Sequence, residues 1–272
     1  MRYRKGQVAI SETRDIPILL IVRNARAVAM SQLIDELFHD QLESNIRSTY
    51  WRVTRLAKSG FLELKGQSRA YGEPVYAITN DGLAALEARG NYLLSLSSNS
   101  KTIVADAEVL HMVEINAIRL ALKHAGILVS WKSELEIISE NLVSNANSKD
   151  YDAMVSVRLG DRQATFALEF ERTAKSAARY YEISKSIVYD DSTDLVLYLA
   201  ANQELLSLLA QELRALKEKV AFGLSNQFKA QLLHTPVLTV GDTPEFRPLA
   251  QILDYLPETQ RPKLDRAAML SV

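Results

Sequence analysis

Three acidic side chains are spaced so that they could act together on one ligand: Asp152, Glu169 and Glu171. Two runs of alternating apolar residues lie on either side of Gly160-Asp161, a dipeptide typical of a β-hairpin turn. Because side chains alternate across a strand, Glu169 and Glu171 project from the same face, and Asp152 opens the neighbouring strand. Carboxylates converging in this way can hold a divalent cation.

The two glutamates also have a simpler explanation. Charged side chains on the exposed face of an edge strand discourage aggregation and need no ligand. A helix expected from about Thr173 to Tyr189 follows, and it carries the cations Lys175, Arg179 and Lys185. The sequence leaves both explanations open.

Composition sets bounds on the protein class. The chain has 272 residues, enough for two domains of ordinary size, with 47% apolar and 24% charged residues. It contains no cysteine, which excludes disulfides, Cys-ligated zinc and a thiol nucleophile. No apolar run reaches the roughly 18 residues that a membrane span needs. We therefore expect no membrane partner and predict a cytoplasmic protein.

Charge is distributed unevenly along the chain. The net charge is −1, but residues 1–90 hold 13 Lys and Arg against 10 Asp and Glu. The N-terminal part therefore carries +3 and the remainder −4. A basic N-terminal part favours an anionic partner, although the placement of the charges matters more than their sum.

Residues 15–90 have the pattern of three helices, a hairpin and a fourth helix. The third helix is expected from Glu43 or Ser44 to Lys58, where Ser59-Gly60 ends it. Projected at 100° per residue, one of its faces is apolar and the other is basic. A hairpin with a long polar tip, residues 66–73, comes next. Helix order, basic face and hairpin together predict a winged helix-turn-helix domain over residues 1–90 that binds double-stranded DNA.

The residues of that basic face differ in their expected contacts. Phosphate contacts are predicted for the cations of the helix and of the hairpin, and base contacts for polar residues near the N-terminus of the helix. The alternative is an ordinary solvated helix face. Trp51 could contact sugar or belong to the core. The expected phosphate contacts are Arg47, Arg52, Arg55, Lys58, Lys65 and Arg69, and the expected base contacts are Ser44, Asn45 and Ser48.

A Ser-rich stretch, residues 91–104, is expected to be a linker to a second domain over residues 105–272. The second domain has the order helix, three strands, helix, strand, helix, strand, which predicts an α+β or α/β sandwich. Its first helix spans 105–125, its third 202–222, and the apolar strand 194–201 suits the middle of a sheet. On the first helix His111 is expected to be structural.

This order, with Asp152 on the second strand and Glu169 on the third, resembles the PD-(D/E)xK nuclease-like fold, also called restriction-endonuclease-like. The resemblance implies that Asp152 and Glu169 bind Mg²⁺, with Glu134 as an additional metal ligand. The sequence departs from the pattern because Tyr151 replaces the usual proline and Glu171 replaces the usual lysine. On the following helix Lys175 or Lys185 could supply that lysine.

From about residue 15 to 215 the chain resembles the plasmid replication-relaxation family, which joins a winged helix to a nuclease-like domain. The resemblance implies a role on plasmid or mobile-element DNA, in replication control, mobilisation or transcription. It rests on short matches at His111, Asn116, Trp131, Glu134-Leu135, Asp152-Ala153, residues 168–173, Lys185 and Tyr189.

Two functions follow from these observations. The favoured one is a sequence-specific DNA-binding regulator that needs no cofactor, has a degenerate nuclease-like domain and is a homodimer. The helix 202–222 could supply part of the dimer interface, and core packing explains its apolar residues equally well. The other is a Mg²⁺-dependent endonuclease with metal ligands Glu134, Asp152 and Glu169. In that case Glu171 assists as base and Lys175 or Lys185 stabilises the developing charge. The missing lysine at Glu171 makes the enzyme the weaker hypothesis.

Overall fold

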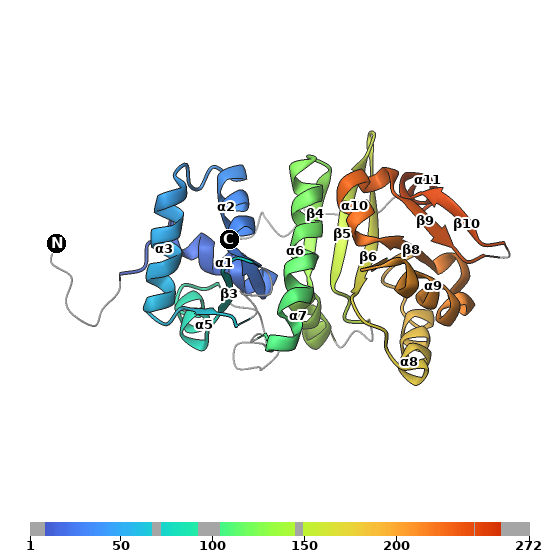
Figure 1. Ribbon diagram of the computed structural model, residues 1–272, viewed down its shortest axis with the longest axis horizontal. Helices are drawn as coiled ribbons and strands as arrows, with labels where there is room; N and C mark the ends of the chain where they lie inside the picture. Colours follow the sequence, from blue (N-terminus) through green and yellow to red (C-terminus); the bar gives the residue numbers. More distant parts are fainter. Residues whose placement is uncertain (1–8, 67–71, 92–103, 145–148, 242, 257–272) are drawn as a thin grey trace, which may run out of the picture.

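The computed structural model describes residues 9–66, 72–91, 104–144, 149–241 and 243–256. Within these residues the strands form two sheets, a small N-terminal one and a large C-terminal one. Figure 1 shows the N-terminal unit at one end of the long axis, with helix α6 (Val109–His124) between that unit and the large sheet. None of the described helices is both long and apolar enough to cross a membrane.

The N-terminal unit packs its helices around a small antiparallel sheet of strand order β1-β3-β2. The helices and the hairpin expected from the sequence are present, with β1 as an additional strand. Side-chain caps begin two of the helices: the Asn45 side chain accepts from the backbone N–H groups of Arg47 and Ser48, and Thr79 accepts from Gly82. The elements are α1 (Asp15–Ala25), β1 (Ala27–Ala29), α2 (Met30–His39), α3 (Ile46–Lys58), β2 (Leu62–Leu64), β3 (Val75–Ile78) and α5 (Asn80–Glu87).

The C-terminal unit is built on a mixed sheet with the order β10-β9-β8-β7-β6-β5-β4 among the described strands. Neighbours are antiparallel from β4 to β6, parallel from β6 to β8 and antiparallel from β8 to β10. The β5–β6 hairpin turns at Gly160-Asp161 as predicted, with Leu159 opposite Arg162 and φ +60° at Gly160. The strands are β4 (Leu128–Ser133), β5 (Ala153–Leu159), β6 (Arg162–Glu171), β7 (Val196–Ala200), β8 (Val220–Leu224), β9 (Pro236–Thr239) and β10 (Glu245–Pro248).

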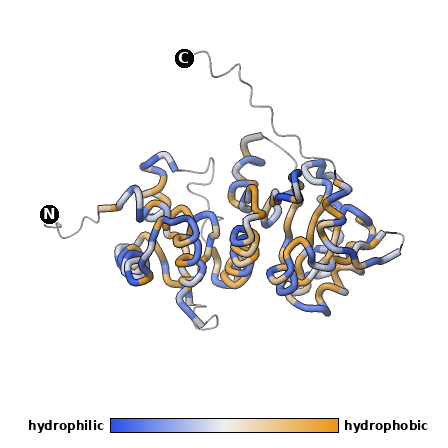
Figure 2. Tube along the Cα trace, turned by 90° about the horizontal axis from the view of Figure 1, so that it is seen from above, coloured by the Kyte–Doolittle hydropathy of each residue, from blue (hydrophilic) through white to orange (hydrophobic). Residues whose placement is uncertain are grey.

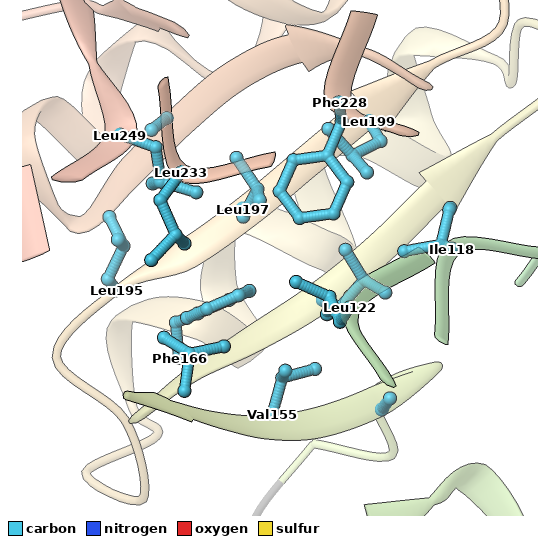
Figure 3. Packing of buried hydrophobic residues seen from close by; sticks show 14 of the residues in the cluster. Ile118, Leu122, Val155, Phe166, Leu195, Leu197, Leu199, Phe228, Leu233 and Leu249 are labelled. Atoms are coloured by element: carbon cyan, nitrogen blue, oxygen red, sulfur yellow. The ribbon is translucent and has the colours of Figure 1, made fainter. Parts of the chain in front are cut away.

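Helices cover both faces of the large sheet. One face packs on α6, α10 (Ser225–Gln231) and α11 (Leu249–Asp254), and Figure 3 shows Ile118, Phe228 and Leu249 converging on strand residues such as Phe166 and Leu197. The other face packs on α8 (Ala177–Val188) and α9 (Gln203–Glu212). In Figure 2 the apolar segments run through the interior of both units. The predicted helix-and-sheet sandwich is therefore confirmed.

The structure corrects the predicted order in two places. Helix α7 (Glu134–Ser144) stands between β4 and β5, where the sequence was expected to pass directly from strand to strand. The predicted helix 202–222 ends at Glu212, a 3₁₀ segment (Arg214–Lys219) follows, and β8 begins at Val220. Lys217 lies in the left-handed region, with φ +48°, which a continuous helix cannot contain.

The two units share a hydrophobic contact and a set of ion pairs. Ala27, Ala29, Val75 and Ala77 of the small sheet are buried against residues of α6 such as Val113. Acidic residues of α2 face basic residues of α6: Glu36 bonds to Arg119 and to Lys123, and Lys123 also binds Asp40 at 2.7 Å. Helix α6 therefore packs against both units.

Candidate functional site

Asp152 immediately precedes β5, at the N-terminal end of that strand of the large sheet. Its Oδ2 accepts from the backbone N–H of Phe170 at 2.7 Å, and its Oδ1 lies 3.2 Å from Nε2 of His111 on α6. The His111 ring also stacks on the Phe170 ring, with centroids 5.4 Å apart. The sequence therefore placed Asp152 correctly beside β6. His111 was singled out on its helix, but its pairing with Asp152 was not predicted.

Glu169 and Glu171 are buried, and both lie on β6, which is flanked by β5 and β7. The explanation of an exposed edge strand is therefore wrong. Each glutamate bonds to one lysine: Glu169 to Lys149, which precedes β5, and Glu171 to Lys175, in the segment before α8. Lys149 was not predicted, because it lies in a polar stretch without periodicity.

Glu134 is the first residue of α7, and it binds a residue of the N-terminal unit. Its Oε2 accepts from Nη1 of Arg26 at 2.7 Å, while Nη2 of Arg26 donates to Glu108 at 3.0 Å. Arg26 follows α1 with φ +59°, a conformation that costs a non-glycine residue about 1–3 kcal/mol. Its guanidinium is buried, so these two carboxylates supply its counter-charge.

Burial and pairing determine the charge of this centre. Burial alone would raise the pKa of Asp152, but the hydrogen bond and charge of His111 and the N–H of Phe170 hold it below its ordinary value. Burial would lower the pKa of His111, and Asp152 instead raises it. Burial lowers the pKa of Lys149 to about 8, although Asp152 opposes this. Burial also raises the pKa of Glu134, which Arg26 only partly offsets.

The donor set does not fit a divalent cation as it is arranged. Each of the four acidic residues bonds to its own basic residue, so its charge is already compensated: Glu134 to Arg26, Asp152 to His111, Glu169 to Lys149 and Glu171 to Lys175. In the part of the chain that the structure describes, no group of three His, Asp or Glu side chains is placed to hold one ion. The structure does not bring Lys185 into this set: its ammonium is exposed, 3.5 Å from Glu182 on the outer face of α8.

Helix α3 presents a second candidate surface at the outer end of the N-terminal unit (Figure 1). Its exposed residues include Arg47, Tyr50, Trp51, Thr54 and Lys58, which lie three or four residues apart and so share one face. Helical projection places Ile46 and Tyr50 on the apolar face of this helix, but both are exposed. Neither Arg47 nor Lys58 has an ionic partner among the described residues. Trp51 does not belong to the core, because 62% of its surface is exposed.

Arg52 and Arg55, two predicted phosphate contacts, are engaged inside the unit. Arg52 binds Glu43 at 2.8 Å and Asp15 at 3.4 Å, and Arg55 also binds Asp15. Their guanidinium carbons lie 6.0 Å and 5.5 Å from the Trp51 ring centroid. Helical projection could not reveal these pairs, because Asp15 comes from another helix.

The remaining predicted contacts of this surface differ in availability. Ser44 is exposed, the Asn45 side-chain oxygen caps α3, and Ser48 accepts from Arg14 at 3.1 Å. Lys65 is buried and binds Glu63 at 2.9 Å and Asp106 at 3.5 Å. Arg69 lies outside the described residues.

Fold and site together define an α/β protein in which a helix-and-hairpin unit is docked on a mixed sheet with a paired-charge centre. The replication-relaxation family matches residues 19–191, from α1 to just beyond α8 and over more than half of the chain. The chain belongs to the replication-relaxation family, as its sequence motifs predicted.

Comparison with solved structures adds little. Two structures of the restriction endonuclease FokI, one bound to DNA, are similar to this chain at 11% identity and a TM-score of 0.23. They cover 79% and 80% of this chain, which spans only 43% of each FokI chain. A TM-score this low supports no conclusion about fold or function. No curated protein matches the chain.

Proposed function

We propose that the N-terminal unit is a winged helix-turn-helix and that the protein binds double-stranded DNA through the exposed face of α3. The observation that carries this proposal is the pair of free cations, Arg47 and Lys58, with Trp51 between them on an outward-facing helix. Arg and Lys side chains neutralise backbone phosphates, and a helix of this kind fits the major groove. Family membership supports a role on plasmid or mobile-element DNA, in replication, mobilisation or transcription.

Arg52 and Arg55, although paired inside the unit, also support a role for the exposed face of α3. Arg52 and Arg55 bind Asp15 and Glu43 and lie close to the indole of Trp51. They therefore act as positioning residues that fix the exposed ring, which lowers the entropy lost when it contacts DNA. The side-chain oxygen of Asn45 accepts the hydrogen bond that caps α3. Ser44, Arg47 and Trp51 are therefore the better candidates for contacts with base edges.

Fluorescence anisotropy with a labelled duplex at several salt concentrations tests this proposal. The double variant Arg47→Ala/Lys58→Ala should bind more weakly, and its slope of log K against log salt should fall by about 2, since about 0.9 is lost per phosphate contact. Arg158→Ala is the matched control, because Arg158 is exposed at the end of β5 in the other unit. Equal affinities and slopes for wild type and double variant would overturn the proposal.

We further propose that the centre around Asp152 holds the C-terminal unit together and does not catalyse DNA cleavage. The support is the pairing of each carboxylate with one cation or imidazole. Wild-type protein should then leave supercoiled plasmid intact with Mg²⁺ or Mn²⁺. Metal-dependent nicking that Asp152→Ala abolishes would establish the endonuclease instead.

The homodimer and the cytoplasmic location remain predictions that accompany this function. Helix α9 does not supply the expected dimer contact, because Leu205, Leu209 and Leu213 are buried in the core of the same chain. Light scattering of the protein, free and on DNA, will determine the oligomeric state.

A further inference from the structure

Helix α8 has an exposed face that the paired-charge centre does not use. Tyr180, Ile183 and Ile187 pack into the core below the sheet. Tyr181 and Lys185 are exposed on the opposite side, Arg179 is exposed in the first turn, and Tyr189 follows the last turn with 81% of its surface exposed. Arg172, at the end of β6, is also exposed. We call Arg172, Arg179, Tyr181, Lys185 and Tyr189 the α8 face.

Positive charge dominates the α8 face. Between residues 172 and 189 the sequence has four basic residues and one acidic residue, Glu182. Glu182 is compensated by Lys185, whose ammonium lies 3.5 Å from its carboxylate and 4.5 Å from the Tyr181 ring centroid. Arg172 and Arg179 have no ionic partner among the described residues. Cations without an ionic partner in the described part of the chain are available to an external anion.

The side-chain types of the α8 face indicate which anion it would bind. Arg, Lys and Tyr are side chains that hydrogen-bond to phosphate oxygens of nucleic acids, and such contacts position a protein without reading sequence. Backbone phosphates present regularly spaced negative charge, which complements cations spread along a helix. We propose that the α8 face is a second duplex-DNA contact surface, which binds the phosphate backbone away from the α3 site. This inference rests on the proposed function of α3.

Because α3 and α8 lie far apart, the affinity for DNA should depend on the length of the duplex. In Figure 1 α3 lies at one end of the long axis and α8 lies in the other half of the molecule, beyond α6 and the β5–β6 hairpin. One duplex that touches both helices must therefore extend well beyond the segment that α3 alone contacts. A short duplex can occupy only one of the two surfaces.

The experiment compares two duplexes by anisotropy, one of about 10 base pairs, near one helical turn, and one of about 40 base pairs. The variant Arg172→Ala/Arg179→Ala should bind the long duplex several-fold more weakly than wild type, with a salt slope smaller by about 2. Its binding of the short duplex should be unchanged at the α3 site. Both residues are exposed, and Arg158→Ala at the opposite end of the β5–β6 hairpin is again the matched control.

Each outcome separates the α8 inference from the α3 proposal. If the α8 variant binds each duplex with the same affinity and salt slope as wild type, the α8 inference is wrong and the α3 proposal stands. If Arg47→Ala/Lys58→Ala keeps its affinity for the long duplex while the α8 variant loses it, the α3 proposal is wrong and the α8 face carries binding. If the α8 variant instead converts a dimer to a monomer in light scattering without changing DNA affinity, the face is a protein contact and the inference fails.

Discussion

Arg26 and Glu134 form an ion pair across the junction between the two units, with Nη1 and Oε2 2.7 Å apart. Arg26 ends the first helix of the N-terminal unit, and Glu134 begins α7 beside the large sheet. The pair therefore ties the orientation of the N-terminal unit to the neighbourhood of Asp152. Burial raises the pKa of Glu134, and the charge of Asp152 adds to this effect.

Removing this ion pair should weaken the protein measurably. Glu134→Gln leaves the buried Arg26 guanidinium with Glu108 alone, so we expect a loss of about 1–3 kcal/mol in the free energy of unfolding. In urea titrations the double variant Arg26→Met/Glu134→Gln should lose less than the two single variants added together. Strict additivity would show that the pair contributes no coupling.

His111 and Asp152 should make stability depend on pH. The raised pKa of His111 means that its contribution is fully present below its unfolded pKa and is lost as pH rises through the folded value. The lowered pKa of Asp152 means that its contribution is present above its unfolded pKa and is lost as pH falls through the folded value. The pair is therefore most stabilising between the ordinary pKa values of the two groups.

The measurement compares wild type with His111→Gln, which keeps a hydrogen-bond donor but not the titration. Near pH 5.5 wild type should be more stable by about 1.5–3 kcal/mol, the range for hydrogen bonds to charged groups. The difference should shrink toward pH 9. A difference that stays constant over this range would contradict the assignment of a charged His111.

Asp15 should contribute far more to stability than its position in a first helical turn suggests. Its carboxylate is buried, binds both Arg52 and Arg55, and accepts from the backbone N–H of Ser11 at 2.8 Å. Asp15→Asn should lower the free energy of unfolding by about 3–5 kcal/mol, because it removes a buried counter-charge from the guanidinium groups of Arg52 and Arg55.

Asp81 is the matched control, an exposed aspartate in the first turn of α5. Asp81→Asn should cost about 0.3–1 kcal/mol through the helix dipole alone. Thermal unfolding of the two variants provides the comparison. Similar losses for both would rule out a special role for Asp15.

Gly82 in α5 should not accept a side chain. Alanine in a helix is usually about 1 kcal/mol better than glycine. Here a Cβ would lie 2.3 Å from the carbonyl oxygen of Phe61 and 2.7 Å from Cγ1 of Ile78. Gly82→Ala should therefore destabilise the N-terminal unit, by about 1–3 kcal/mol. A Cβ at Gly66 meets no atom of the described residues within 4 Å, so Gly66→Ala is the control and should be close to neutral.

Local patterns predicted the parts of the fold that depend on local geometry. The Gly160-Asp161 turn and the alternation around it predicted the β5–β6 hairpin and its register, since a two-residue turn fixes both. Ser59-Gly60 predicted the C-terminal end of α3 at Lys58 in the same way, whereas its start was placed at Glu43 or Ser44 and lies at Ile46, after the Asn45 cap. The helix through Lys217 was wrong because leucine spacing continued past α9, whereas the backbone turns at Lys217 and β8 completes the sheet.

The site needed information that no local pattern contains. Arg55 was assigned to an exposed basic face, but its partner Asp15 is 40 residues away in sequence. Glu134 was grouped with Asp152 as a metal ligand, but the cation that binds it, Arg26, is 108 residues away. Helical projection predicts the direction in which a side chain points, but it does not predict which charged residue from another part of the chain lies there.

The hydrophobic contact between the small sheet and α6 determines where the N-terminal unit can be cut from the rest of the chain. A fragment ending near residue 90 would expose Ala27, Ala29, Val75 and Ala77, the sheet residues that α6 covers. Recombination between genes would therefore need to carry the N-terminal unit together with residues up to His124. The family match, residues 19–191, includes both the small sheet and α6.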